Sequence, residues 1–384
     1  MMAQVSRQRH CDVPAESSYY WLTVRDAEAR REATRRRLEN PSAAALDAQE
    51  LSLLAGYGGA APLFARLPIP YRLVPLHVRT ALLGAKYRLE ARRVEGTAFP
   101  AWPIESSVDR QRASGWERAT AEAGVPLERP AWPEGRRAAF LLTHDVDSRP
   151  ELGLIAALRD AEHVRGLPSA VGFVPRISWP TQAYAEDMVA NGAELYCHDI
   201  GHDGRLPTLS AAEAVGAFAT VFEASPWAQR LMRGFRSGQL LMSPDLRTAV
   251  GETFDYDMSL PDTERGGAYG FSAGCATVFP FAIGPLLEIP LTLPQDVFLL
   301  QVHRLSPERA LACWLRKIEY IVSVGGVAVL NVHPVWVNPS RQRMWDAYVR
   351  LLDAVAADER LWVTTPARLA QWLDQLRYGS AADE

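Results

Sequence analysis

The sequence predicts an α/β protein built on a parallel sheet or barrel. From about residue 134 onward, short apolar runs of strand length alternate with longer segments of helical character, and this alternation is typical of a parallel α/β fold. Polar residues follow directly after several of the apolar runs. Because the functional residues of such folds collect at the carboxyl ends of the strands, we expect the functional site at that edge.

The elements of this region follow one another as strand and helix pairs. The expected strands are short and mostly apolar, and they cover 138–147, 169–175 and 193–199. The expected helices have helical length and spacing, and they cover 150–166, 182–192 and 210–224.

The composition is that of a soluble globular protein. Of the 384 residues, 48% are hydrophobic and 22% are charged, and the formal charge of −4 does not fit a general nucleic-acid binder. The most apolar stretch, 277–294, contains four prolines and Glu288, which excludes a continuous membrane-spanning helix there. The four cysteines form no CxxC pair, and the first residues lack the apolar core of a signal peptide. We therefore expect a reduced, cytoplasmic protein.

The first 133 residues have a different pattern and form a predicted N-terminal extension. Residues 15–60 are expected to form two helices. Residues 66–93 carry seven basic side chains and one acid, interleaved with apolar residues. Such a stretch either contacts an anionic membrane face or phosphates, or packs on a neighbouring domain. The predicted organisation is a mainly helical extension with a Trp- and Pro-rich linker over 1–133, an α/β domain over 134–377 and a tail over 378–384.

Two carboxylates end the strand expected at 138–147. The two-residue period of a strand places Asp145 and Asp147 on one face, and His144 on the opposite face as a buried histidine. Acids this close repel each other, which favours a bound cation or a raised pKa in one of them. The alternative is a surface pair that caps a helix, because the sequence SRP after Asp147 resembles a helix start.

Two histidines follow the strand expected at 193–199. His198 and His202 are four residues apart, and Gly201 and Gly204 favour a loop over a long helix. Two imidazoles and one carboxylate suit Zn²⁺ or a related divalent ion such as Co, Ni, Mn or Fe. The alternative is a pair of structural histidines. Cys197 is expected on the opposite strand face, packed in the core.

Five short motifs occur between residues 132 and 376, in the order THDVD, HDIGH, GFRSGQ, LLEIPLTLPQD and VLNVHPVW. In type and order they resemble the motifs of the NodB-homology polysaccharide deacetylases of carbohydrate esterase family 4. The resemblance implies that residues 134–377 form an irregular (β/α) barrel of the NodB type after the helical extension. It also implies that Asp145 is the general base and that Asp147, His198 and His202 are the metal ligands.

The resemblance implies further roles in the last three motifs. Arg236 would hold the carboxylate of the base, and the amide at Gln239 would face the developing oxyanion. Glu288 and Asp296 are both candidate acids of the fourth motif, and His333 would be the general acid. The family usually has Pro and an aromatic residue where this chain has Gly238 and Gln239.

The residue types suit the hydrolysis of an acetamide, which needs an activated water, a polarised carbonyl and a proton for the leaving amine. The predicted function is metal-dependent removal of an N-acetyl group from an amino sugar, in a nucleotide- or lipid-linked precursor of a cell-surface glycan. The predicted location is the cytoplasm, with peripheral membrane contact through residues 66–93. Two alternatives remain: an amidohydrolase of small non-sugar amides, and a catalytically silent glycan-binding protein with the same fold.

Overall fold

The computed structural model describes residues 78, 101–107, 109–110, 121, 132–264, 274–283 and 286–378. Most of the expected N-terminal extension, with nearly all of its basic segment 66–93, lies outside the described residues, as does the chain after Tyr378. Within the described part of the chain, no helix combines the length and the apolar character needed to cross a membrane.

Strands and helices alternate along the described chain, as the sequence predicts. The strands are β1 (Ala138–Val146), β2 (Ser169–Phe173), β3 (Glu194–His198), β4 (Met232–Arg236), β5 (Tyr256–Asp257), β6 (Phe281–Ile283), β7 (Leu286–Glu288), β8 (Val327–Val332) and β9 (Leu361–Thr364). The α-helices are α5 (Ile155–His163), α6 (Gln182–Ala190), α7 (Ala211–Ala224), α8 (Pro226–Leu231), α9 (Pro244–Thr253), α10 (Pro307–Val324), α11 (Gln342–Ala357) and α12 (Pro366–Tyr378). Short 3₁₀ helices include η4 (Arg149–Gly153) and η6 (Gly238–Leu240).

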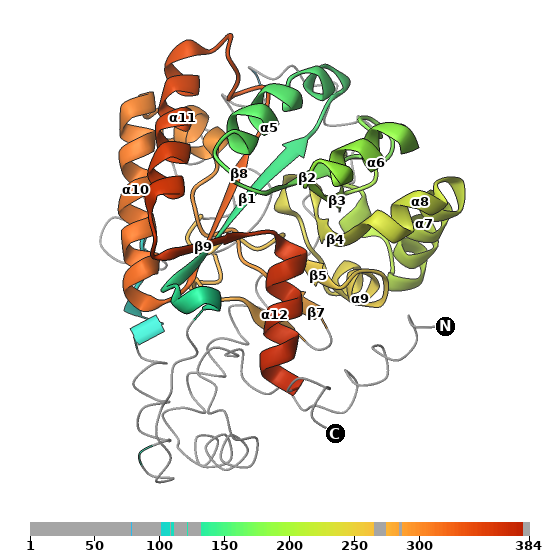
Figure 1. Cartoon of the computed structure of the whole chain (residues 1–384). Helices are drawn as coiled ribbons and strands as arrows, with labels where there is room; N and C mark the ends of the chain where they lie inside the picture. Colours follow the sequence, from blue (N-terminus) through green and yellow to red (C-terminus); the bar gives the residue numbers. More distant parts are fainter. Residues whose placement is uncertain are drawn as a thin grey trace.

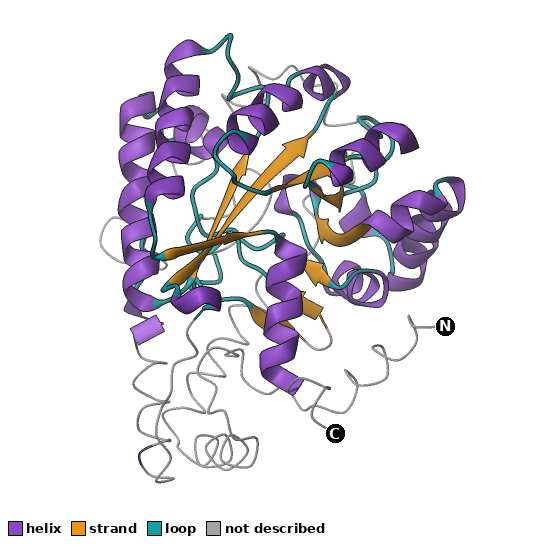
Figure 2. Cartoon of the chain, in the orientation of Figure 1, coloured by secondary structure: helices purple, strands orange, loops and turns teal. Residues whose placement is uncertain are grey.

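The strands form one curled sheet that the helices surround (Figure 2). Its order is β6-β7-β5-β4-β3-β2-β1-β8, and every pairing in it is parallel except that of β6 with β7. Helices α10 and α11 pack side by side on one flank, and α6 to α9 lie on the other (Figure 1). The expected (β/α) architecture is confirmed.

Strand β1 lies next to the end strand β8 in this order and shares its other edge between two partners. Residues 142–146 pair with β2, residues 138–141 pair with β9, and residues 139–144 pair with β8. Because a strand has only two edges and β8 occupies one of them, β9 and β2 must follow each other along the other edge.

The segment 289–296 closes the gap between β5 and β8 without forming a regular strand. The Leu291 amide donates to the Leu260 carbonyl (2.7 Å), and the Leu293 amide donates to the Val329 carbonyl of β8 (2.9 Å). One extended segment thus bonds to both sides of the opening. This is why the barrel is irregular.

The two faces of the sheet bury two apolar clusters. Every second residue of β1, such as Phe140 and Leu142, packs under the outer helices, whereas Leu141 between them faces the interior of the barrel. Helix α12 adds Leu369 and Leu373 to the interior cluster. The start of α12 also binds the start of β3, since the Ala367 amide donates to Glu194 (2.8 Å). Helix α12 therefore covers the end of the barrel where the strands begin, and the carboxyl ends of the strands lie at the other end.

Candidate active site

Asp145 is buried near the end of β1 and receives hydrogen bonds from three neighbouring side chains. Its Oδ1 accepts from the Tyr196 hydroxyl (2.5 Å) and from Arg236 Nη1 (3.1 Å). Its Oδ2 accepts from Asn331 Nδ2 (2.7 Å). These partners come from β3, β4 and β8, so four strand ends meet around one carboxylate.

The charges around Asp145 keep it ionised. Burial alone opposes ionisation, but the positive charges of His198, Arg236 and His333 outweigh it and hold the pKa of the carboxyl far below its ordinary value. Burial also disfavours the charge of Arg236, yet Tyr196 and Asp145 raise the pKa of the guanidinium. The structure therefore places Arg236 against Asp145, where the family resemblance implies it.

Tyr196 reaches Asp145 because a glycine lies beneath its ring on the neighbouring strand. A Cβ atom at Gly172 of β2 would lie 2.2 Å from Cε2 of Tyr196. Any side chain there would displace the ring and the hydroxyl that bonds Asp145. Tyr196 lies outside the sequence motifs that predict the site. The strand period offers the signal, since Tyr196 precedes His198 by two residues on the same face.

Asp147, His198 and His202 form a group whose potential ligand atoms all lie within 4.8 Å of one another. His198 Nε2 is 3.1 Å and His202 Nε2 is 3.5 Å from Asp147 Oδ1. His198 Nδ1 lies 3.1 Å from the Arg236 carbonyl, which can only accept, so that nitrogen carries the proton. When the ring is neutral, the lone pair of Nε2 faces the Asp147 carboxylate.

This group fits a cation. Asp147 Oδ1 and His198 Nε2 are buried and have no hydrogen-bond partner among the described residues. Two acceptors this close repel each other unless a positive charge lies near both. Burial opposes a charge on His198, but Asp145 and Asp147 raise the pKa of the imidazole. The geometry thus favours a proton or a metal ion between these side chains.

The segment after His198 is a loop, as the two glycines predict. Asp199 and His202 have φ angles of 61° and 49°, and the Asp199 carboxylate fixes the turn by accepting from the Gly201 amide (3.2 Å) and the Gly238 amide (3.0 Å). A Cβ atom at Gly238 would lie 2.9 Å from Cδ2 of His202. Glycine is therefore required where the β4 loop passes the loop that carries His202.

The carboxylate of Asp147 does not cap a helix, which was the alternative interpretation. The helix that follows is η4, whose N-cap is Ser148. Glu151 accepts from the Asp147 amide (2.9 Å) and from the Ser148 hydroxyl (3.0 Å). The backbone of Asp147 therefore joins the helix start, while its side chain faces the two histidines.

His333 follows β8 directly, and its ring lies between Asp145 and Asp296. Its Nε2 lies 3.8 Å from Asp145 Oδ2, and its Nδ1 lies 2.7 Å from Asp296 Oδ1. Burial disfavours the charged ring, but Asp296 raises the pKa of His333 to about 10. The raised pKa favours a protonated imidazole at neutral pH.

The other acid of the fourth motif lies elsewhere. Glu288 is opposite Asp257 in the β5 and β7 pairing, and its Oε1 accepts from the Leu260 amide (2.8 Å). Burial and the Asp257 carboxyl raise the pKa of Glu288 well above its ordinary value. Of the two candidates, Asp296 is the one that contacts His333.

Gln239 lies on η6 with a φ angle of 58°. Both polar atoms of its amide are buried and make no hydrogen bond to the described part of the chain. A buried amide without partners is costly, and a ligand could satisfy it.

The residues expected on the outer face of the strands lie there. His144 is fully buried and its Nε2 lies 2.7 Å from Glu162 of α5. Cys197 packs in the outer apolar cluster. Both predictions are confirmed, and neither side chain belongs to the site.

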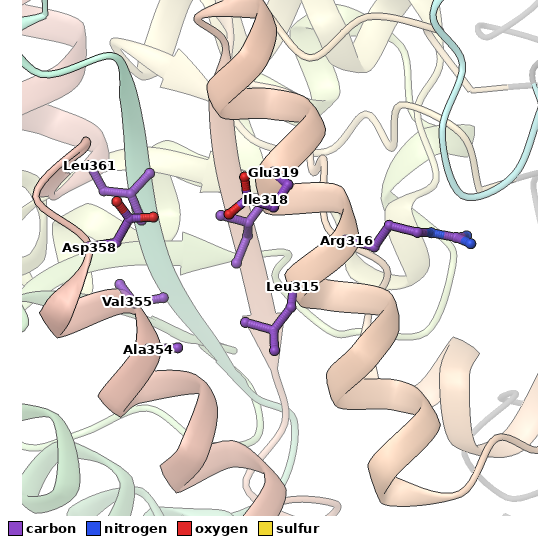
Figure 3. Close-up of a pocket in the computed structure, with 8 residues that line it drawn as sticks. All are labelled: Leu315, Arg316, Ile318, Glu319, Ala354, Val355, Asp358 and Leu361. Carbon is purple, nitrogen blue, oxygen red and sulfur yellow. The ribbon is translucent and has the colours of Figure 1, made fainter.

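A separate surface pocket of about 330 Å³ lies outside the barrel, between α10, α11 and the start of β9. Figure 3 shows Leu315 and Ile318 of α10 across from Val355 of α11. None of the predicted site residues lines it.

Comparison with solved structures agrees with this architecture. A polysaccharide deacetylase structure from Mycobacterium smegmatis shares 17% identity and covers 65% of this chain and 94% of its own, with a TM-score of 0.52. A polysaccharide deacetylase structure from Pseudomonas aeruginosa PAO1 shares 16% identity and covers 67% of this chain and 96% of its own, with a TM-score of 0.50. No protein-family model and no curated protein matches the sequence.

Proposed function

We propose that this chain, which has the NodB-type polysaccharide deacetylase fold, hydrolyses the N-acetyl group of an amino sugar with the help of a divalent metal ion. One observation carries the proposal: a buried acid and a histidine, Asp145 and His333, lie 3.8 Å apart beside an acid and two histidines that fit a cation. A base, an acid and a cation site are what amide hydrolysis requires.

Asp147, His198 and His202 would hold the metal. When bound there, Zn²⁺ or a related divalent ion lowers the pKa of a coordinated water and polarises a carbonyl oxygen. The ordered hydrogen bond of His198 Nδ1 to the Arg236 carbonyl supports this assignment, because metal-binding histidines usually have their second nitrogen held in this way.

The chain's own residues would move two protons. Asp145, held by Arg236, takes a proton from the attacking water as the new C–O bond forms at the acetyl carbon. His333, held by Asp296, gives its proton to the sugar nitrogen as the C–N bond breaks. Acetate and the free amine are the products. The unpartnered amide of Gln239 would donate to the acetyl oxygen while its charge develops.

The first test compares substrates. Purified protein loaded with Zn²⁺ is incubated with a nucleotide-linked N-acetylhexosamine, with N-acetylated sugar oligomers and with small ureides and cyclic amides. We expect acetate and a free amine from the sugars and a loss of about 10²- to 10⁴-fold in turnover in Asp145→Asn. Hydrolysis of ureides alone would favour a non-sugar amidohydrolase. Sugar binding without hydrolysis would favour a glycan-binding protein.

The finer identity of the substrate is also a proposal. A nucleotide- or lipid-linked precursor on the cytoplasmic side fits the basic composition of residues 66–93, which would meet a pyrophosphate or an anionic membrane face. We expect the protein to sediment with anionic phosphatidylglycerol vesicles and to lose this binding when Arg79, Arg88 and Arg92 are replaced by glutamate. Retained binding in that variant would exclude this segment as the anchor.

A further inference from the structure

We propose that Gln295 and Glu264 are positioning residues that fix the amide of Asn331, and through it the carboxylate of Asp145. The inference rests on the proposed role of Asp145 as the base. These two residues lie behind the site, and their side-chain hydrogen bonds join them to each other and to Asn331.

Asn331 is the link between the site and this outer pair. It lies on β8 opposite Thr143 of β1 and is fully buried. Its Nδ2 donates to Asp145 Oδ2 (2.7 Å) and to Gln295 Oε1 (3.1 Å), and its Oδ1 accepts from Arg236 Nη1 (3.0 Å). Both ends of the amide therefore have partners.

The chain of contacts continues to Glu264. Gln295 lies on the segment that closes the barrel, and its Nε2 donates to Glu264 Oε2 (3.2 Å). Its backbone amide donates to Glu264 Oε1 (2.8 Å). Gln295 and Glu264 are 4% and 2% exposed, so water cannot readily replace either partner.

The direction of each hydrogen bond in this chain depends on the next. Arg236 can only donate, so Asn331 must turn its oxygen toward Arg236 and its NH₂ group toward Asp145 and Gln295. Gln295 must then present its oxygen to Asn331 and its NH₂ group to Glu264. Only an acceptor at Glu264 completes this order. An NH₂ group in place of the Glu264 oxygen would face the NH₂ group of Gln295. If Gln295 rotated to avoid this, its NH₂ group would face that of Asn331.

The isosteric variant Glu264→Gln creates this conflict. The backbone amide of Gln295 still needs an acceptor, so the new side chain turns its NH₂ group toward Gln295 Nε2. Either that contact is lost or Gln295 rotates and opposes Asn331. In both cases the chain of hydrogen bonds that holds Asp145 is weakened, although the side chain at position 264 keeps its volume and shape.

The chain offers a matched control. Glu194 is a half-buried carboxylate that also accepts from a backbone amide and a side chain, those of Ala367 and Tyr256, but it lies at the opposite end of the barrel. Glu194→Gln therefore removes an equivalent charge without touching Asn331. Gln295→Met serves as a second test variant if Glu264→Gln does not fold.

One readout requires no turnover. The chain contains only four asparagines, Asn40, Asn191, Asn331 and Asn338, so selective ¹⁵N-asparagine labelling gives four side-chain NH₂ signals, and Asn331→Leu identifies the one of interest. Measurements are made at pH 9, because burial raises the pKa of Glu264 to about 8. We expect the Asn331 signal to move in Glu264→Gln and in Gln295→Met, and to stay in place in Glu194→Gln.

The second readout is kinetic. Acetyl release, also measured at pH 9, should show a kcat lower by about 10- to 100-fold with an unchanged KM in Glu264→Gln, and near wild-type values in Glu194→Gln. An unmoved Asn331 signal in both test variants, or an unchanged kcat beside a moved signal, would overturn the proposal. If the wild-type chain releases no acetate, the proposed function fails while the NMR comparison still decides whether the contacts order Asn331.

Discussion

Asp296 holds His333 at two points, since one carboxylate oxygen accepts from the His333 backbone amide and the other lies against Nδ1, each at 2.7 Å. The backbone contact fixes where the residue stands, and the side-chain contact fixes how its ring turns. Nε2 is thereby directed toward Asp145. The acid and the base of the proposed reaction are oriented by separate groups.

This relationship predicts a shift in pH dependence for Asp296→Asn. Burial favours the neutral ring and Asp296 opposes it, so the pKa of His333 is raised to about 10. The protonated form donates the proton, and activity is therefore lost as pH rises through this value. Removing the carboxylate lowers the pKa, and we expect the alkaline limb of the kcat profile to move to lower pH. An alkaline limb at the wild-type position would exclude His333 as the group that titrates there.

Metal binding is predicted to depend on His198, at the end of β3, and on His202 in the loop that follows. Plasma mass spectrometry should find near-stoichiometric metal in the wild type and none in a folded His198→Ala, His202→Ala variant. His163→Ala is the matched control, because this histidine is exposed at the end of α5. Equal metal content in all three proteins would refute the site.

Gly238→Ala is predicted to weaken the metal site from outside it. The added Cβ atom would lie 2.5 Å from Asp199 Oδ2 and 2.9 Å from Cδ2 of His202, so the loop that carries the ligand must move. We expect metal affinity to fall by about 10- to 100-fold in a competition titration with a chelator. Gly216→Ala, at an open position in α7, should leave it unchanged.

Arg236→Leu is predicted to destabilise the fold as well as the chemistry. The guanidinium is fully buried and bonds Asp145, Asn331 and the Met258 carbonyl. Its loss leaves the buried Asp145 carboxylate without its positively charged partner, which costs about 3–5 kcal/mol. Urea denaturation should show this loss, and adding Asp145→Asn should recover part of it. No recovery in the double variant would mean that Arg236 acts on stability through its other contacts.

The strand period accounts for most of what could be predicted. It places Asp145, Asp147 and His198 on the interior face and sends His144 and Cys197 outward, and the structure agrees. The same rule applied to Tyr196 and Asn331 would have added both to the site. Neither was selected, because a tyrosine or an asparagine within a strand carries no chemical signal until its partner is known.

Pairings across long stretches of chain could not be predicted. Asp296 and His333 are 37 residues apart, and the irregular segment before Asp296 has neither strand alternation nor helical spacing. Choosing between Glu288 and Asp296 required knowledge of which acid the closing segment carries to β8. The hydrogen bonds that link Glu264, Gln295 and Asn331 depend on the same segment, 289–296, which carries Gln295.

The shared edge of β1 has a consequence for how the molecule is made. Strand β9 pairs with residues 138–141, the first part of that edge, and α12 covers the interior cluster. Both elements follow all the other strands and helices of the barrel in the sequence. A chain still leaving the ribosome would already hold its proposed catalytic strand ends together. The opposite end of the barrel, where the strands begin, would still be open to water. We expect the nascent protein to depend on β9 and α12 for resistance to proteases, and a stop codon after Ala357 to yield a product that chaperones retain.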